Sequence, residues 1–242
     1  MTKKEALGLV AKKIAECQSC RYVENQNPVP GEGSPDAQIM FVGEAPGKKE
    51  NETGRPFVGA AGKFLSEMLN SIGLEREDVF IANVIKYQPP GNRDPLPEEI
   101  KFQLPFLKKQ IAIIQPKLIC FLGRHAFSAV LPGYSLPVKS DKLPISGKPA
   151  TISQVHGQLI EKDGQHYLPL YHPAAALYNG GMRQTLLDDF ARIPQFMDEI
   201  YIKESENETK WVFRKNPRIY SHAHSAAYHR EYTHDAMDKI TE

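Results

Sequence analysis

The chain is 242 residues long, 41% hydrophobic and 24% charged, and its 30 Lys and Arg nearly balance its 29 Asp and Glu. These proportions are typical of a globular chain of one large or two small domains, and they exclude collagen-like, wholly disordered and coiled-coil proteins. The sequence has no run near the roughly 18 apolar residues of a membrane span, and its start lacks a signal-peptide core. We therefore expect a cytoplasmic protein that lies outside membranes.

The predicted elements alternate along the first two hundred residues. Apolar residues at helical spacing predict helices over residues 3–16, 64–72, 97–115, 124–131 and 182–200, and a break is expected near Pro105. Continuous apolar runs predict buried strands over residues 37–42, 79–85 and 117–122. Residues 151–161 and 166–170 flank a Lys-Asp-Gly turn, which is typical of a hairpin.

This alternation predicts an α/β fold, a three-layer α/β/α sandwich with a central, mainly parallel sheet. Ligands of such sheets bind at the carboxyl ends of the strands, so we expect the chemistry in the loops at Gly43, Asn83 and His172. Residues 1–200 form the predicted domain. Residues 201–242 change in composition and are expected to be an extension that is partly disordered or helical.

Two glycine-rich loops carry candidate site residues. Residues 43–47 follow a predicted strand, and their glycines let the backbone approach a ligand beside the carboxylate of Glu44. A tight turn with a solvated glutamate explains the same pattern. Phe57 lies in a loop of glycine and proline rather than in a periodic element, where it can serve as a stacking platform for a base or as a loop anchor.

Asn83 interrupts the apolar run over residues 79–85, and His172 stands at the end of another predicted strand. A buried Asn83 must find partners or cost about 1–3 kcal/mol, so it is either locked to the backbone or offered to a ligand. Its carboxamide can pair with the N3–H and O4 of uracil but not with the matching edge of cytosine. His172 could donate to a negative charge that develops on a substrate, and a structural role is the alternative.

The chain has three cysteines, too few for a disulfide framework. Cys17 and Cys20 form a CxxC pair, which indicates a redox or metal function. Cys120 lies inside an apolar run and is expected to be a buried core residue.

Taken together, these motifs resemble family 4 of the uracil-DNA glycosylase superfamily, the iron–sulfur type. The resemblance covers residues 9–197 in unbroken order. The matching stretches are residues 17–20, 43–47, 54–62, 83–86, 89–95, 115–119, 122–124 and 172–176. It implies a DNA-repair hydrolase of base excision repair that cleaves the N-glycosidic bond of uracil in DNA and leaves an abasic site. A catalytically silent relative that binds DNA or damaged bases is the alternative.

The resemblance also implies site roles. A flipped uracil would stack on Phe57 and be read by Asn83, and its O2 would be held by His172 and by backbone amides near Gly43. Glu44 would orient or activate the attacking water and offset the cationic sugar. Glu50 matches an acidic position at the pocket wall that obstructs the methyl group of thymine.

DNA contacts follow from the same resemblance. The loop at residues 89–95 and the segment after His172 would touch the DNA backbone, with Arg93 and Arg183 as candidate phosphate partners. A solvated surface charge is the alternative for either arginine. We expect a monomer whose partner is uracil-containing DNA.

The cofactor of the family is a [4Fe–4S] cluster on four cysteines, and here the last two positions are Tyr87 and Gln103. Two thiolates cannot complete that coordination, so we expect no cluster, with Cys17 and Cys20 as a remnant that serves as a labile metal site or a redox pair. Tyr87 is a candidate to replace the cluster by aromatic packing. Histidines of the extension, at positions 222, 224, 229 and 234, could bind a metal or lie in a solvated stretch.

Overall fold

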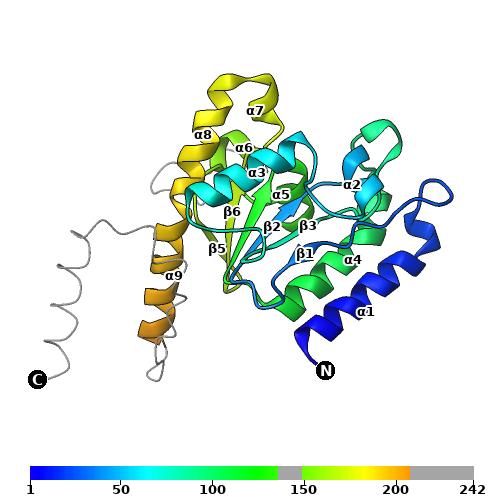
Figure 1. Cartoon of the computed structure of the whole chain (residues 1–242). Helices are drawn as coiled ribbons and strands as arrows, with labels where there is room; N and C mark the ends of the chain where they lie inside the picture. Colours follow the sequence, from blue (N-terminus) through cyan, green and yellow to red (C-terminus); the bar gives the residue numbers. More distant parts are fainter. Residues whose placement is uncertain (136–148, 208–242) are drawn as a thin grey trace, which may run out of the picture.

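A computed structural model of the chain describes residues 1–135 and 149–207 (Figure 1). Within these residues a sheet of six strands has the order β1-β3-β2-β4-β6-β5. The four inner strands run parallel, and the edge strands β1 and β5 are antiparallel to their neighbours. The strands are β1 Glu32–Gly33, β2 Ile39–Gly43, β3 Phe80–Asn83, β4 Leu118–Leu122, β5 Ile160–Lys162 and β6 Gln165–Leu170. The predicted mainly parallel sheet is confirmed.

Helices cover both faces of the sheet, as predicted. Residues of α3, α8 and α9 pack on one face, residues of α4, α5 and α6 pack on the other, and α1 lies outside α4. The helices are α1 Lys3–Glu16, α2 Lys48–Thr53, α3 Ala60–Ser71, α4 Pro97–Ile114, α5 Arg124–Val130, α6 Ile152–Val155, α7 Ala175–Tyr178, α8 Gly180–Ala191 and α9 Ile193–Asn207, with 3-10 turns at Gln18–Cys20 and Pro90–Asn92.

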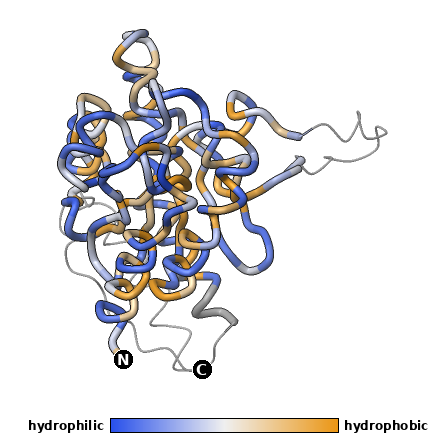
Figure 2. The backbone as a smooth tube through the Cα atoms, turned by 90° about the vertical axis from the view of Figure 1, so that its right-hand side faces the viewer, coloured by the Kyte–Doolittle hydropathy of each residue, from blue (hydrophilic) through white to orange (hydrophobic). Residues whose placement is uncertain are grey.

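The inner strands are apolar on both sides because both sides are covered. In β2, Ile39 and Phe41 pack toward α3 and α8, while Met40 and Val42 pack toward α4 and α5. Figure 2 shows apolar stretches running through the middle of the molecule, whereas many outer turns are hydrophilic. Cys120 is fully buried in β4, as the sequence predicted.

Three predicted elements differ in the structure. The expected break near Pro105 is wrong, because α4 continues through it; Pro105 lies on the exposed face, where the carbonyl that loses its partner can meet water. The first arm of the hairpin is a strand only over β5, since residues 152–155 form α6. The single helix expected over residues 182–200 is two helices, and Pro194 suits the first turn of the second.

Helix α9 crosses residue 200 and ends at Asn207. The rest of the predicted extension, including its histidines, lies outside the described residues. In the part of the chain that the structure describes, no helix is both long and apolar enough to cross a membrane.

Candidate functional site

Four of the predicted site residues meet at the carboxyl edge of the sheet. Gly43 and Asn83 are register partners at the ends of β2 and β3. A Cβ atom on Gly43 would lie 2.4 Å from Asn83 Oδ1 and 2.5 Å from Cζ of Phe57, so only glycine leaves room for both side chains. The rings of Phe57 and His172 are 5.8 Å apart between centroids. The structure thus places the ring of Phe57 and the amide of Asn83 against Gly43, with the imidazole of His172 beside the ring.

The carboxamide of Asn83 ends β3 and is 1% exposed. Its Oδ1 atom is buried and has no hydrogen-bond partner among the described residues. An unpaired buried acceptor costs about 1–3 kcal/mol of folding free energy. The atom is therefore available to an N–H group of a ligand that enters beside Phe57.

The loop that carries Phe57 is anchored by Glu50. Its Oε1 accepts hydrogen bonds from the amides of Val58 and Gly59, both at 2.8 Å. A Cβ atom on Gly47 would lie 2.9 Å from Oε2 of Glu50. Glu50 therefore bridges the two glycine-rich loops, and in this structure its carboxylate is engaged with backbone amides.

His172 is held as a neutral hydrogen-bond donor. Its Nδ1 accepts a hydrogen bond from the amide of Ala174 at 3.1 Å, so the ring proton of the neutral form is on Nε2. Burial lowers the pKa of His172 to about 4; the charge of His125 acts in the same direction and that of Glu50 acts against it. Near neutral pH the imidazole is uncharged and can donate from Nε2.

Glu44 belongs to a charged cluster at the edge of the same site. Its Oε1 lies 3.9 Å from Nδ1 of His125, whose Nε2 lies 3.3 Å from Asp94. Burial raises the pKa of Glu44, Asp94 adds to the increase, and His125 and Arg124 oppose it. His125 was not predicted from the sequence, although its place just after β4 was a usable signal, since ligands bind at the carboxyl ends of central strands.

The cluster of Glu44, Asp94 and His125 has the ligand types of a metal site. Ligand atoms of Glu44, Asp94 and His125 all lie within 4.8 Å of one another. However, Arg124 Nη2 already lies 3.6 Å from Asp94 and supplies a compensating positive charge. We therefore assign no metal to these residues.

Both candidate phosphate-binding arginines hold a carboxylate. Arg93 makes two hydrogen bonds to Glu99, at 2.5 and 2.9 Å. Arg183 pairs with Glu67, and its guanidinium lies 4.4 Å from the ring centroid of Phe64. Each arginine would have to exchange its carboxylate for a phosphate to contact DNA.

The four positions that correspond to the cluster cysteines do not offer a four-thiolate donor set. Cys17 and Cys20 form a disulfide. Tyr87 is fully buried and its hydroxyl donates to the carbonyl of Ile14 at 2.7 Å. Gln103 accepts from the amide of residue 86 at 2.6 Å and donates to the carbonyl of Cys20 at 3.3 Å. The side chains of Tyr87 and Gln103 thus connect the segments that a cluster would join. The residues present do not fit a [4Fe–4S] cluster.

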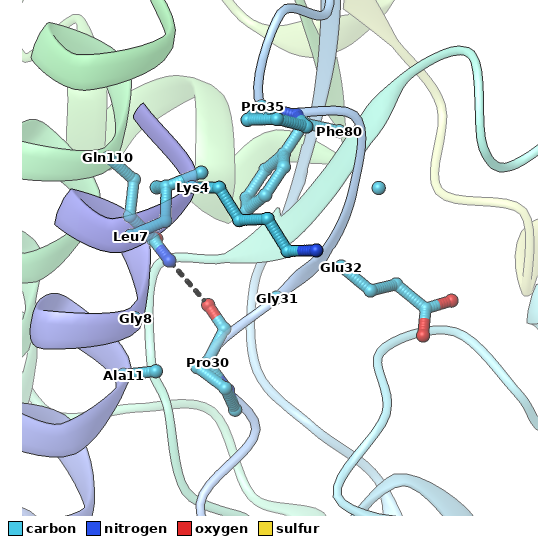
Figure 3. Close-up of a pocket in the computed structure, with 11 residues that line it drawn as sticks. Lys4, Leu7, Gly8, Ala11, Pro30, Gly31, Glu32, Pro35, Phe80 and Gln110 are labelled. Atoms are coloured by element: carbon cyan, nitrogen blue, oxygen red, sulfur yellow. Dashed lines mark hydrogen bonds between the residues drawn. The ribbon is translucent and has the colours of Figure 1, made fainter. Parts of the chain in front are cut away.

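A cavity of about 390 Å³ lies elsewhere, between α1 and residues 30–35. Figure 3 shows Gln110 donating to the carbonyl of Pro30 in its wall. None of the residues predicted for the site lines this cavity. The candidate site is therefore defined by the convergence of side chains over Gly43.

A planar heterocycle with an N–H group fits the arrangement over Gly43, because it offers a face to Phe57, a donor to Asn83 and an atom that can take charge beside His172. This α/β fold and its site define a class of proteins that bind a nucleobase.

The chain belongs to the uracil DNA glycosylase superfamily, whose family profile matches residues 30–194. It is 45% identical over 195 residues to a type-4 uracil-DNA glycosylase of Sulfurisphaera tokodaii. It is 42% identical to proteins of the same name from Saccharolobus solfataricus and Archaeoglobus fulgidus, over 195 and 194 residues. The matches cover 78% of this chain and 84%, 85% and 92% of these relatives.

Proposed function

We infer that the chain is a uracil-DNA glycosylase, a hydrolase of base excision repair that cleaves the bond between uracil and deoxyribose in DNA and leaves an abasic site. The observation that carries this inference is the unpaired, buried Oδ1 of Asn83 beside the ring of Phe57. The names of relatives that are 42–45% identical to it over 194–195 residues support the same activity.

Base recognition follows from the amide. An everted uracil stacked on Phe57 presents N3–H to Oδ1 of Asn83 and O4 to its NH2 group. Cytosine presents an unprotonated N3 and an amino group, so it would set acceptor against acceptor and donor against donor. We therefore propose that Asn83 selects uracil, with Glu50 holding the Phe57 loop at the pocket wall.

Bond cleavage needs a stabilised leaving group. As the bond breaks, uracil becomes an anion and the sugar becomes a cation, so donors aimed at O2 lower the barrier directly. We propose that Nε2–H of His172 and amides near Gly43 supply these donors. A neutral imidazole can donate a hydrogen bond to O2 and still keep its proton. The low pKa of His172 favours this neutral form.

Specificity gives the simplest test of the function. The purified full-length chain is incubated with three oligonucleotides that carry uracil, cytosine or thymine at one position, and abasic sites are revealed by alkali on a gel. We expect cleavage of the uracil strand only. Comparable cleavage of the cytosine strand would contradict the proposed reading of the base by Asn83.

The attacking water is assigned to Glu44, and a pH profile tests this role. Only the ionised form of Glu44 can orient the water and offset the positive charge on the sugar. We therefore expect kcat/KM to fall as the pH drops through the raised pKa of Glu44. Asp94→Asn removes a repelling charge and should move this acid limb to lower pH. His125→Ala removes an opposing positive charge and should move it to higher pH.

The measurement is kcat/KM from about pH 4.5 to 9 for the wild type and both variants. His172 does not account for a limb well above pH 4, since burial lowers its pKa to about 4. An acid limb that stays in place in both variants would show that another group controls the activity.

DNA contacts are proposed at two segments. Loop 89–95 carries Arg93, and α7, which follows His172 closely, exposes 48% of Leu177 and 90% of Tyr178. Exposed apolar side chains beside a base pocket suit contact with unpaired bases. Arg183, one turn into α8, would reach a phosphate after it releases Glu67.

We further propose that the chain works without a [4Fe–4S] cluster and that Tyr87 stabilises the region instead. Tyr87 packs with Val10, Ile14 and Cys20 between α1 and α4. Tyr87→Ser is expected to reduce the free energy of unfolding by about 3 kcal/mol and the Tm by roughly 6–12 °C. Tyr87→Phe, the matched control, keeps the ring and should cost only about 1 kcal/mol.

Thermal unfolding of the three proteins checks this, and an unchanged Tm in Tyr87→Ser would show that the ring is dispensable. Iron and sulfide analysis of protein purified without oxygen tests the cofactor directly. We expect no stoichiometric iron, and about four iron atoms per chain would contradict the proposal.

The remaining assignments rest on the substrate. We propose that residues 1–200 make up the catalytic domain, that the protein acts as a monomer on uracil-containing DNA, and that it works in the cytoplasm where that DNA lies.

A further inference from the structure

We propose that Arg76, held by Glu32, is a positioning residue for the stacking ring of Phe57. The proposal rests on the function inferred above, since it assigns the part that holds the base platform in place. Neither residue was singled out in the sequence, because neither lies in a motif of the resemblance.

The backbone of Phe57 needs support. Its φ is +51°, a left-handed conformation that costs a side-chain-bearing residue about 1–3 kcal/mol and persists only where surrounding contacts hold it. The start of α3 also packs against it, because a Cβ atom on Gly62 would lie 1.8 Å from the carbonyl oxygen of Phe57. The ring direction thus depends on a strained peptide in a crowded place.

Arg76 supplies the support on the carbonyl side. Its Nη1 donates to the carbonyl of Phe57 at 3.0 Å, and its Nη2 donates to the carbonyl of Pro56 at 2.7 Å. The rigid guanidinium fork holds two successive peptides at once, which a lysine cannot do. After Phe57 in the chain, Glu50 accepts hydrogen bonds from the amides of the next two residues.

Glu32 fixes the guanidinium. Its Oε1 accepts from Nη2 of Arg76 at 2.5 Å and from Nε at 3.1 Å, and its Oε2 accepts from Nε of Arg55 at 2.7 Å. Burial raises the pKa of Glu32, but Arg55 and Arg76 outweigh this effect and hold it below its usual range. Figure 3 shows the Glu32 carboxylate directed away from α1.

The same contacts link the platform to the base reader. Glu32 lies in β1 and pairs in register with Ile81 of β3, the strand that ends at Asn83. Arg76 therefore joins the loop of Phe57 to the strand of Asn83. A loose link would let the ring shift against the amide, and a misplacement of about 1 Å can cost 10²-fold in rate.

A double-mutant cycle separates positioning from mere stability. Arg76→Gln and the control Arg55→Gln are each made in the wild type and in Phe57→Ala, and single-turnover uracil release is measured well below every Tm. Arg55 shares the contact with Glu32, but its side chain is 59% exposed and it holds no carbonyl of the Phe57 loop in these contacts.

If Arg76 acts through the ring, Arg76→Gln lowers the rate about 10–100-fold in the wild type but less than about 2-fold in Phe57→Ala. Arg55→Gln should change it less than about 2-fold in either background. An equal loss from Arg76→Gln in both backgrounds would overturn the positioning role while leaving the proposed function intact. A wild type that releases no uracil would overturn the function instead.

A second measurement does not depend on activity. Hydrogen exchange at the amides of Val58 and Gly59 should become faster in Arg76→Gln, and in Arg76→Lys if the glutamine variant fails to fold, but not in Arg55→Gln. Unchanged protection of these amides in the Arg76 variant would overturn the proposal.

Discussion

His172→Ala is expected to lower the single-turnover rate of uracil release by about 10²–10³-fold, because it removes a donor aimed at the charge that develops on O2. The structure supports this expectation through the Nε2 proton, which the bond from Ala174 to Nδ1 leaves free for a ligand. The measurement is the rate constant of cleavage with enzyme in excess over a uracil oligonucleotide.

His156→Ala is the matched control. This histidine is also partly buried, but it pairs with Asp189 at 2.8 Å and is not among the residues that converge over Gly43. It should lower the Tm while leaving the rate nearly unchanged at low temperature. A loss of rate in His172→Ala no greater than in His156→Ala would remove His172 from the reaction.

Asn83→Leu is expected to abolish most of the activity, by about 10³-fold, while leaving the stability unchanged or improved. Leucine has nearly the same shape as asparagine and brings no polar atom. The substitution therefore removes a buried acceptor that has no partner among the described residues. That unpaired acceptor costs folding free energy in the wild type. The activity should thus fall while the stability stays the same or rises.

Thermal unfolding beside the activity assay checks this pair of outcomes. Gly43→Ala is a useful companion, because its Cβ would lie 2.4 Å from Asn83 Oδ1 and should displace the amide and damage the pocket while Asn83 itself is retained. A Tm that falls by many degrees in Asn83→Leu would mean that Asn83 is a structural residue, and the proposed reading of uracil would lose its basis.

Much of the fold was predictable because the inner strands are continuous apolar runs bounded by glycine or polar residues. Such runs are covered on both faces, so their pattern does not depend on which helix packs where. Gly43 and Asn83 were predictable as neighbours for the same reason, since parallel strands end at one edge.

Other features depend on contacts between distant segments. Gln103 and Tyr87 join α4, residue 20 and α1 through bonds that no local pattern encodes. Arg76 looks like an ordinary surface cation in the sequence, and only the fold brings it to Phe57. Likewise, the periodicity of α8 continues into α9, so the break between them was missed.

The central claim is that residues over Gly43 grip an everted uracil and stabilise it as it leaves. It is tested most directly by incubating the full chain with a uracil oligonucleotide and measuring free uracil and alkali-sensitive sites in the same sample. We predict equal molar amounts of both, formed by the wild type and nearly absent in Asn83→Leu and His172→Ala. Tight binding of the oligonucleotide with no free uracil would contradict the account and identify the chain as a silent relative.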